Sequence, residues 1–240
     1  MKCWYLLFVL ACVGLCEKQF KTPVVFIHGC PGNEHDGDVI GSVLAQLHPG
    51  QPFYSLASDG GDESFKDLRV QLKDYQNEIQ SIIDSHPDQF ANGFHLLGHS
   101  QGGIIGRAVL EASDNFNIRN FVSISGVQGG IYGGCEDFGY TDCEALTEHF
   151  YSPEVRNSYS IAQFWRSPNY NNYLKGCGYL PYLNNELDPN PSYKNNTLRI
   201  NHMYLLGSDT GLSSVITPFN IICVFSHCCL LHCIIQFMNR

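Results

Sequence analysis

Basic charge is scarce in this 240-residue sequence. It has 14 lysines and arginines against 23 aspartates and glutamates, a formal net charge of −9, and no stretch where basic side chains gather. Proteins that bind nucleic acid present a basic patch or stripe to the phosphates, so nothing here indicates a nucleic-acid partner. Internal repeats and low-complexity tracts are also absent.

Metal-binding spacings are lacking as well. Asp59, Asp62 and Glu63 form an acidic turn without the spacing of a calcium loop, so we expect a solvated turn there. The cysteines and histidines near the C-terminus match no zinc pattern; they are Cys223, His227, Cys228, Cys229, His232 and Cys233. We therefore expect neither a metal site nor a cofactor.

The N-terminus has the features of a secretory signal peptide, which we assign to residues 1–16. Lys2 supplies positive charge, residues 3–13 are apolar, and Gly14-Leu15-Cys16 is a small-residue cleavage site. The apolar part is too short to span a membrane, although a signal anchor is the alternative. Of the 11 cysteines, three lie in this segment. In an oxidising compartment the other eight favour disulfides over thiol chemistry.

Strands and helices alternate along residues 17–240, which have the length of one domain. Buried or β-branched runs predict strands at residues 23–27, 53–57, 94–97, 119–124 and 198–206. Helical periodicity predicts helices over residues 65–83, with Ser64 as N-cap, and 102–112. This alternation predicts an α/β fold with a mostly parallel sheet flanked by helices on both faces, and ligands at the carboxyl ends of the strands.

The most informative motif is Gly98-His99-Ser100-Gln101-Gly102, which has the form G-x-S-x-G and lies between an expected strand and an expected helix. A strand that turns sharply into a helix leaves no room for side chains at Gly98 and Gly102. It also directs Ser100 outward, above the first free amides of the helix. This turn holds the nucleophile in the α/β-hydrolase fold, so we expect that fold and acyl transfer through Ser100.

Residues 126–197 interrupt the alternation and are rich in Tyr, Asn, Gly and Pro. In a hydrolase such a segment is expected to form a cap-like insertion over the active site, with a groove for an apolar acyl chain. Simple packing onto the sheet is the alternative for each side chain. Those concerned are Tyr151, Tyr159, Ile161, Phe164, Trp165, Tyr170, Tyr173, Leu174, Tyr179, Leu180, Tyr182 and Leu183. Asn195-Asn196-Thr197 is an N-glycosylation sequon with Asn195 as acceptor.

Further landmarks follow one another at residues 22–29, 98–103, 124–133, 164–168 and 182–186. Together they resemble the palmitoyl-protein thioesterase family over residues 21–218, and residues 215–218 look most like its lysosomal members. The resemblance implies hydrolysis of thioesters between long-chain fatty acids and cysteine or coenzyme A, in lysosomes or after secretion. A lipase or carboxylesterase is a close alternative.

The resemblance also implies roles for individual residues. Ser100 Oγ, deprotonated by a histidine, attacks the thioester carbonyl, and water later releases the fatty acid from the acyl-enzyme. The backbone amides of Gln101 and Cys30 would hold the oxyanion, while His28 shapes the loop that contains Cys30. Asp209, after the last expected strand, is the expected triad acid. A short disulfide loop of the family matches Cys135 and Cys143.

The chain departs from the family after Pro218. Residues 219–240 form a short, divergent, hydrophobic tail, so we expect the strand and helix that hold the family's histidine loop to be missing. His227 is the expected base, with His232 behind it. Without that support we expect weak or absent thioesterase activity, and the alternative to an active enzyme is a hydrolase-like acyl-binding protein or truncated isoform without a base. Residues 221–238 lack formal charge, but two histidines make them a poor membrane anchor, and we expect no stable span.

Overall fold

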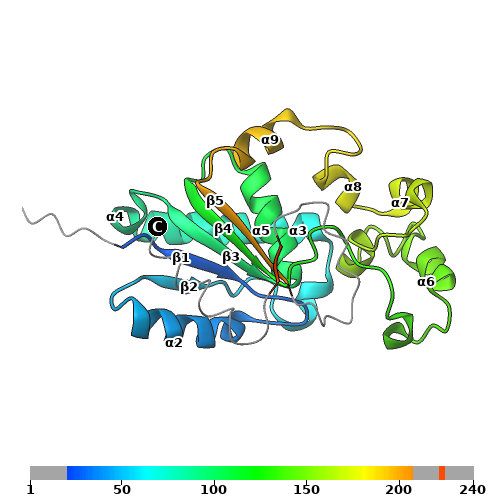
Figure 1. Cartoon of the computed structure of the whole chain (residues 1–240), viewed down its shortest axis with the longest axis horizontal. Coiled ribbons are helices and arrows are strands. Elements are labelled where there is room, and N and C mark those ends of the chain that lie inside the picture. Colours follow the sequence, from blue (N-terminus) through cyan, green and yellow to red (C-terminus); the bar gives the residue numbers. More distant parts are fainter. Residues whose placement is uncertain (1–20, 208–221, 225–240) are drawn as a thin grey trace, which may run out of the picture.

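A parallel β-sheet forms the centre of the molecule (Figure 1). The computed structural model describes residues 21–207 and 222–224. Within them the strand order is β2-β1-β3-β4-β5-β6, and every neighbouring pair is parallel. The strands are β1 (Val24–Ile27), β2 (Phe53–Ser55), β3 (Phe94–His99), β4 (Ile118–Ile124), β5 (His202–Gly207) and β6 (Ile222–Val224). The predicted α/β fold with a parallel sheet is confirmed.

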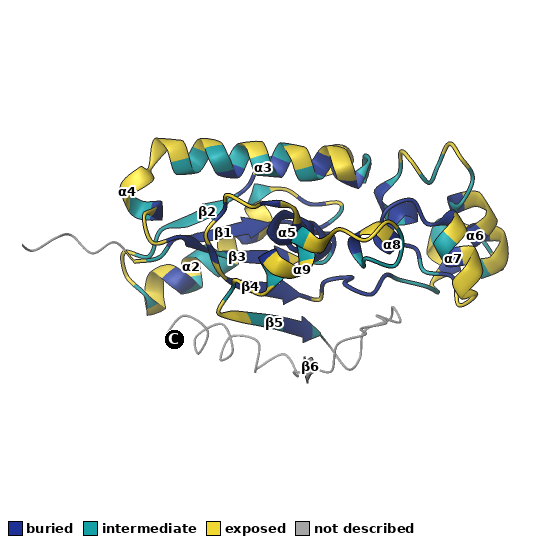
Figure 2. Cartoon of the chain, turned by 90° about the horizontal axis from the view of Figure 1, so that it is seen from above, coloured by how far each residue is buried: buried dark blue, intermediate teal, exposed yellow. Residues whose placement is uncertain are grey.

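Helices cover both faces of this sheet. On one face, α2 (Asp38–Leu47) follows the short 3-10 helix η1 (Glu34–Gly37). On the other face lie α3 (Leu68–Ser85) and α5 (Gln101–Ala112), with α4 (Pro87–Phe90) between α3 and β3. Figure 2 shows the buried strands between α3 and α2, with the outer side of α3 exposed. The prediction of helices on both faces is therefore also confirmed.

Alternating strand side chains enter two different cores. From β1, Val25 and Ile27 join the core beneath α3 and α5, whereas Val24 and Phe26 join the core beneath α2. All four side chains are buried. A strand buried on both sides is typical of a parallel sheet covered by helices, which explains why its sequence is a continuous apolar run.

The long helix begins later than the periodicity predicts, so the expectation of Ser64 as N-cap is wrong. Ser64 lies in the 3-10 helix η2 (Gly61–Phe65), and its hydroxyl donates to the Gly61 carbonyl at 2.6 Å. Lys66 then has extended backbone, with φ −70° and ψ 172°. Asp67 caps α3 instead, because its carboxylate accepts from the Arg69 amide at 2.7 Å.

The segment between β4 and β5 supplies the remaining elements. They are η3 (Cys135–Phe138), α6 (Cys143–Phe150), η4 (Ser160–Gln163), α7 (Tyr170–Gly176), α8 (Leu180–Leu183) and α9 (Pro191–Thr197). Helices α6, α7 and α8 lie beyond the carboxyl ends of the strands, whereas α9 returns beside α5 (Figure 1). Because Leu198 ends α9, the last predicted strand begins only at His202.

The insertion has a small hydrophobic core of its own. Leu146, Phe150, Ala162 and Trp165 are buried there together with Cys135. The Trp165 indole N–H also donates to Thr147 Oγ1 at 2.9 Å. No helix of residues 21–207 has the combination of length and apolar composition that a membrane crossing requires.

A disulfide joins Cys135 and Cys143, with their Cα atoms 5.4 Å apart. It links η3 to α6 at the edge of this small core. On the chain-entropy treatment, closing a loop of this size stabilises the folded state by about 2 to 3 kcal/mol. We therefore expect the Cys135→Ser/Cys143→Ser variant to lose about that much unfolding free energy in urea titrations. Recovery of both cysteines as alkylated free thiols from a non-reduced digest would contradict the bridge.

Candidate active site

Ser100 lies at the turn between β3 and α5 in a backbone conformation that L-residues rarely adopt, with φ 52° and ψ −121°. Its N–H donates to the Ile124 carbonyl of β4 at 2.9 Å, and its own carbonyl accepts from the Gly103 N–H at 3.0 Å. Strained residues of this kind persist where the surrounding structure holds them and are frequent at active sites. The predicted strand-turn-helix around Ser100 is therefore present.

Backbone contacts explain the two glycines of the motif. A Cβ atom on Gly98 would overlap the Gly102 carbonyl, and a Cβ atom on Gly102 would overlap the carbonyls of Ile27 and His28. Backbone atoms cannot move aside as side chains can. The first turn of α5 therefore packs directly on the end of β1, which agrees with the reason for these glycines inferred from the sequence.

The loop after β1 lies beside the serine. Gly29 is so close that a Cβ atom there would lie 3.1 Å from Ser100 Cβ. Cys30 follows, and its half-buried thiol borders the hydroxyls of Ser64 and Ser160. Burial raises the pKa of this thiol, so it is not an activated nucleophile. The predicted oxyanion loop therefore adjoins the predicted nucleophile.

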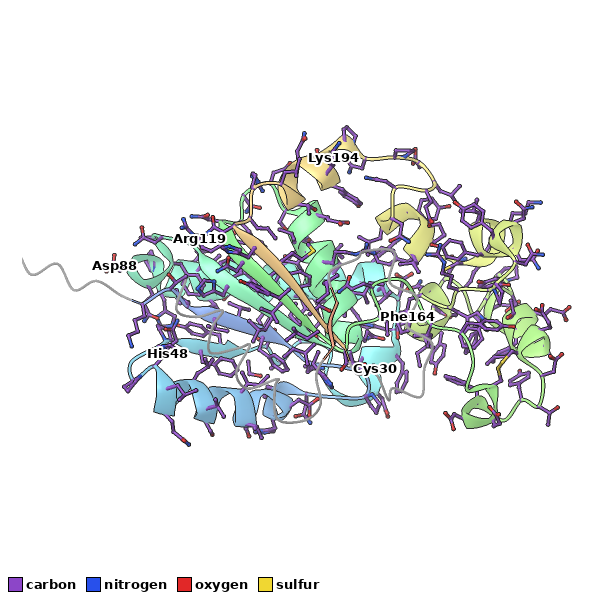
Figure 3. The ribbon with its side chains drawn as sticks, in the orientation of Figure 1. Cys30, His48, Asp88, Arg119, Phe164 and Lys194 are labelled. Atoms are coloured by element: carbon purple, nitrogen blue, oxygen red, sulfur yellow. A yellow bond between two sulfur atoms is a disulfide. The ribbon has the colours of Figure 1, made fainter. Side chains whose placement is uncertain are left out.

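The strand order places this pair at a ligand-binding position. From β1 the chain moves to β2 on one side, and from β3 it moves to β4 on the other. The crevice between the carboxyl ends of β1 and β3 is the switch point at which α/β sheets bind ligands. Figure 3 shows Cys30, after β1, and Phe164, from the insertion, at this end of the sheet. His48, Asp88 and Arg119 lie at the opposite end.

Neither His28, which precedes the Gly29–Cys30 loop, nor His99, which precedes the serine, is hydrogen-bonded to Ser100 Oγ within residues 21–207. His28 is 1% exposed, with Nδ1 2.8 Å from the Gly29 carbonyl and Nε2 3.0 Å from both the Ser58 carbonyl and the Tyr75 hydroxyl. Burial lowers the pKa of His99, against a smaller raising effect of Asp36. Over residues 21–207, no histidine side chain is hydrogen-bonded to Ser100 Oγ.

The carbonyl of Ser64 joins three parts of the structure. It accepts from Gln71 Nε2 of α3 at 2.8 Å, from Gln101 Nε2 of α5 at 2.7 Å and from Ser160 Oγ of η4 at 3.1 Å. Gln101 and Gln71 are also bonded to each other at 3.1 Å. Sequence reasoning selected Gln101 only for its backbone N–H and missed this side-chain network, because buried amides carry no sequence pattern.

The other landmarks of the family resemblance join the insertion to α5 and hold the insertion itself together. Gln128 Nε2 donates to the Gly103 carbonyl at 2.8 Å and so holds the first turn of α5. The Arg166 guanidinium lies 4.5 Å from the centre of the Tyr173 ring and 3.4 Å from Glu186 Oε1. Tyr173 in turn donates to Glu186 Oε2 at 2.5 Å. Gln128 therefore supports the helix that follows Ser100, whereas Arg166 and Glu186 stabilise the insertion.

Much of the expected acyl groove is instead packed interior. Trp165, Tyr173 and Leu180 are fully buried, and Phe164, Tyr179 and Leu183 are nearly so. For these side chains the alternative of packing onto the sheet is correct, except that Trp165 lies in the small core of the insertion, because the other five belong to the core beneath α3 and α5. An aromatic pocket of about 370 Å³ remains, lined by Phe138, Tyr140, Leu146, His149, Phe150, Val155, Ser158 and Tyr159. The Tyr159 ring stacks on Phe65 of η2, with ring centres 5.6 Å apart.

The expectation of a solvated acidic turn is wrong for Asp59. Its side chain is buried and forms an ion pair with Lys66, which also contacts Asp74 at 2.9 Å. Desolvation raises the pKa of Asp59, and the Lys66 ammonium opposes that effect. Lys66 reaches this position because its extended backbone separates η2 from α3, which sequence spacing does not indicate.

Several predicted residues lie outside the described part of the chain: Asp209, His227, His232 and residues 1–16. Strand β5 ends at Gly207 and strand β6 ends at Val224, and these two residues pair with each other. Both lie at the carboxyl ends of their strands, as Ser100 does at the end of β3. Asp209 is the second residue after Gly207, and His227 is the third after Val224. The expectation that no strand precedes the histidine is wrong, because β6 pairs with β5 there.

Comparisons with known proteins agree with this geometry. Residues 23–220 match the family described as palmitoyl protein thioesterase. Lysosomal thioesterase PPT2 of Homo sapiens is 30% identical over 89% of this chain and 70% of that protein. The PPT2 homolog of Drosophila melanogaster is 30% identical over 88% of this chain and 73% of that protein. An esterase structure from Exiguobacterium antarcticum has a TM-score of 0.51 over 91% of this chain and 92% of that chain, at 12% identity, and so shares the fold.

Two charged side chains are buried where α5 faces the insertion. Arg107 Nη2 donates to Asn184 Oδ1, next to α8, at 2.8 Å. Glu111, one turn further along, has no hydrogen-bond partner for its Oε2 atom among the described residues. Burial raises the pKa of Glu111 to about 7, although Arg107 opposes the shift. The folded protein therefore holds a proton on Glu111 more firmly than the unfolded chain does.

This difference predicts that stability falls as the pH rises. The contribution of protonated Glu111 is fully present below the ordinary pKa of 4.5 and is lost as the pH rises through about 7. The loss amounts to about 3 kcal/mol. Urea unfolding should show about 2 kcal/mol of this loss between about pH 5 and about pH 7 in the native chain and a flatter profile in Glu111→Gln. Asp59 is present in both proteins and contributes equally to their profiles. Identical pH profiles would contradict the assignment.

Proposed function

Because the chain belongs to the palmitoyl protein thioesterase family, we propose that it is a serine hydrolase that cleaves long-chain fatty acyl thioesters, such as palmitoyl-CoA or S-palmitoyl-cysteine. The observation that carries the proposal is the strained Ser100 turn at the carboxyl ends of the strands, next to the Gly29–Cys30 loop. Relatives named as thioesterases support the substrate class.

The reaction begins when Ser100 Oγ attacks the thioester carbonyl carbon and His227 takes the hydroxyl proton. Asp209 orients the histidine, and the Gln101 and Cys30 backbone N–H groups bind the oxyanion. The carbon–sulfur bond then breaks, and the thiol leaves with the proton from His227. Water repeats these steps on the acyl-enzyme ester, which releases the fatty acid and restores Ser100.

The acyl chain is proposed to lie along the cap-like insertion, residues 126–197. Tyr159 supports this path because it borders two regions at once. Its phenol lies close enough to Cys30 for the two groups to interact electrostatically, and its ring also lines the aromatic pocket. Aromatic and aliphatic walls suit an alkyl chain, and a volume of about 370 Å³ is within the range of small-molecule sites.

A lysosomal or secreted location is proposed with this activity. Relatives named lysosomal thioesterases, the Cys135–Cys143 disulfide and the signal-peptide pattern of residues 1–16 support it. Asn195, the proposed glycosylation site, is exposed on α9. The proton held by Glu111 would stabilise the fold in an acidic compartment.

The activity test uses the full chain secreted from eukaryotic cells. We expect it to hydrolyse palmitoyl-CoA, and Ser100→Ala to lower kcat by about 10⁶-fold because the nucleophile is lost. His227→Ala should abolish turnover similarly, whereas loss only in His232→Ala would move the base to that residue. No turnover by the native chain would favour an impaired acyl-binding protein. Preferential hydrolysis of a short p-nitrophenyl ester would favour a carboxylesterase.

A second prediction concerns the acyl pocket. The Val155→Trp substitution should fill part of it and exclude about three methylene groups of a long chain, which lowers kcat/KM for palmitoyl-CoA by about 50-fold. Hydrolysis of butanoyl-CoA should change little, because a short chain ends before the pocket. Val39→Trp, at a position 74% exposed on α2, is the matched control. Equal losses for both acyl lengths would place the chain elsewhere.

A further inference from the structure

Basic side chains that are far apart in the sequence come together on one surface of the fold. Arg69, at the start of α3, donates from Nη2 to the Gly178 carbonyl. Arg156, in the turn after α6, donates from Nη1 to the carbonyl of the exposed Lys175 at 3.2 Å. A Cβ atom built on Gly178 would overlap the Arg156 carbonyl, so the two arginines approach the same loop. We call Arg69, Arg156 and Lys175 the cationic cluster.

The charges of this cluster are not neutralised within the protein. Over residues 21–207, Arg156 and Lys175 form no ion pair with a carboxylate, and Arg69 approaches Asp67 only at 3.9 Å. The Arg69 side chain is 47% exposed, although the Gly178 carbonyl holds its guanidinium in place. An arginine that is already held loses little conformational freedom when it binds an anion, and its planar fork matches the geometry of a phosphate. The cluster therefore suits a ligand with phosphate groups.

Aromatic rings lie against the same arginine. The Arg69 guanidinium carbon is 5.2 Å from the centre of the Tyr179 ring and 5.8 Å from the centre of the Tyr182 ring. Tyr179 is buried, whereas Tyr182 is 42% exposed and so offers aromatic surface to a ligand. Nucleotides carry both groups that this surface would recognise, because their phosphates pair with cations and their bases stack on aromatic rings.

Gln163 connects the cationic cluster to the candidate active site. Its Oε1 accepts from the first amide of α3 at 2.7 Å, and a Cβ atom on Gly178 would lie 3.5 Å from its Cγ. Ser160, at the other end of the 3-10 helix η4, borders the Cys30 thiol. The cluster therefore lies beside the Gln163 end of η4, and the proposed oxyanion loop lies beside its Ser160 end.

We propose that the cationic cluster and Tyr182 bind the nucleotide half of coenzyme A, with its phosphates on the three cations and its adenine stacked on the tyrosine. The inference rests on the proposed function and deepens it, because it assigns the thiol carrier of the substrate. In coenzyme A the pantetheine arm separates the thiol from the phosphates, so the phosphates bind beside the reaction site and not at Ser100. A peptide carrier has no such groups.

The first experiment measures binding without using activity. Calorimetry at low salt should show that the full chain binds adenosine 3′,5′-bisphosphate, and Arg156→Gln and Arg69→Gln should each weaken binding about 10-fold. Arg156→Gln keeps the test decisive if loss of the Arg69–Gly178 bond unfolds the other variant. The matched control is Arg119→Gln, which removes an exposed arginine at the opposite end of the sheet (Figure 3). No binding by the native chain, or equal weakening in the control, would overturn the inference.

A second pair of variants tests the base. Tyr182→Ala should weaken binding of adenosine 3′,5′-bisphosphate about 10-fold because the stacking surface is lost, whereas Tyr182→Phe keeps the ring and should bind as the native chain does. Inorganic pyrophosphate has no base, so both variants should bind it with unchanged affinity. Equal losses for the two probes in Tyr182→Ala would overturn the assignment to a nucleotide.

Kinetics with two carriers connect the site to the reaction. Arg156→Gln should raise KM for palmitoyl-CoA about 10-fold with kcat unchanged, and should leave KM for S-palmitoyl-N-acetylcysteamine unchanged, because that carrier ends before the phosphates. Equal rises for both substrates would overturn the inference.

The experiments separate the possible failures. Absence of turnover in the native chain would refute the proposed function, and calorimetry would still decide whether the cluster binds the nucleotide. Binding of phosphatidylserine vesicles that depends on Arg69 and Arg156, without binding of adenosine 3′,5′-bisphosphate, would overturn the inference in favour of an anionic lipid surface.

Discussion

The close approach of the first turn of α5 to the end of β1 is the constraint on which the site depends. Gly102 allows the carbonyls of Ile27 and His28 to contact the helix backbone directly. Because α5 starts at Gln101, directly after Ser100, this contact also fixes how close Ser100 lies to Gly29. The unfavourable φ of Ser100, a cost of about 1 to 3 kcal/mol, is offset by the packing of α5 against β3 and β4.

The Ser64 carbonyl extends this constraint to the insertion. One peptide oxygen receives donors from α3, α5 and η4, all within 3.1 Å. Leaving any buried amide without its partner costs about 1 to 3 kcal/mol, so a shift of η2 would disturb all three elements together. The insertion is therefore positioned by the same segment that holds the Gln101 side chain, and its place over the strand ends is coupled to the serine turn.

Sequence reasoning succeeded where the determining contacts are local. The strands β1 and β4 and the helix α5 fall within a residue or two of their predicted bounds, because buried runs and helical periodicity mark them directly. It failed where distant residues decide. Asp59 was expected in solvent because nothing near it in the sequence reveals Lys66 as its partner, and Tyr173 was expected in a groove because composition does not show that Arg166 and Glu186 cover it.

The order of strands also limits how the proposed triad can close. Ser100 follows β3, and β6 lies three strands away, about 14 Å across the sheet. Three residues after Val224 reach about 10 Å when extended, so the imidazole of His227 must supply the remainder. A path this short would cross the end of β5, which lies between β6 and β4 and ends at Gly207, two residues before Asp209. If His227 is the base, its short connection from β6 would therefore bring it close to Asp209, the proposed orienting carboxylate. His232 is eight residues after Val224, so its longer connection would not be limited to this path.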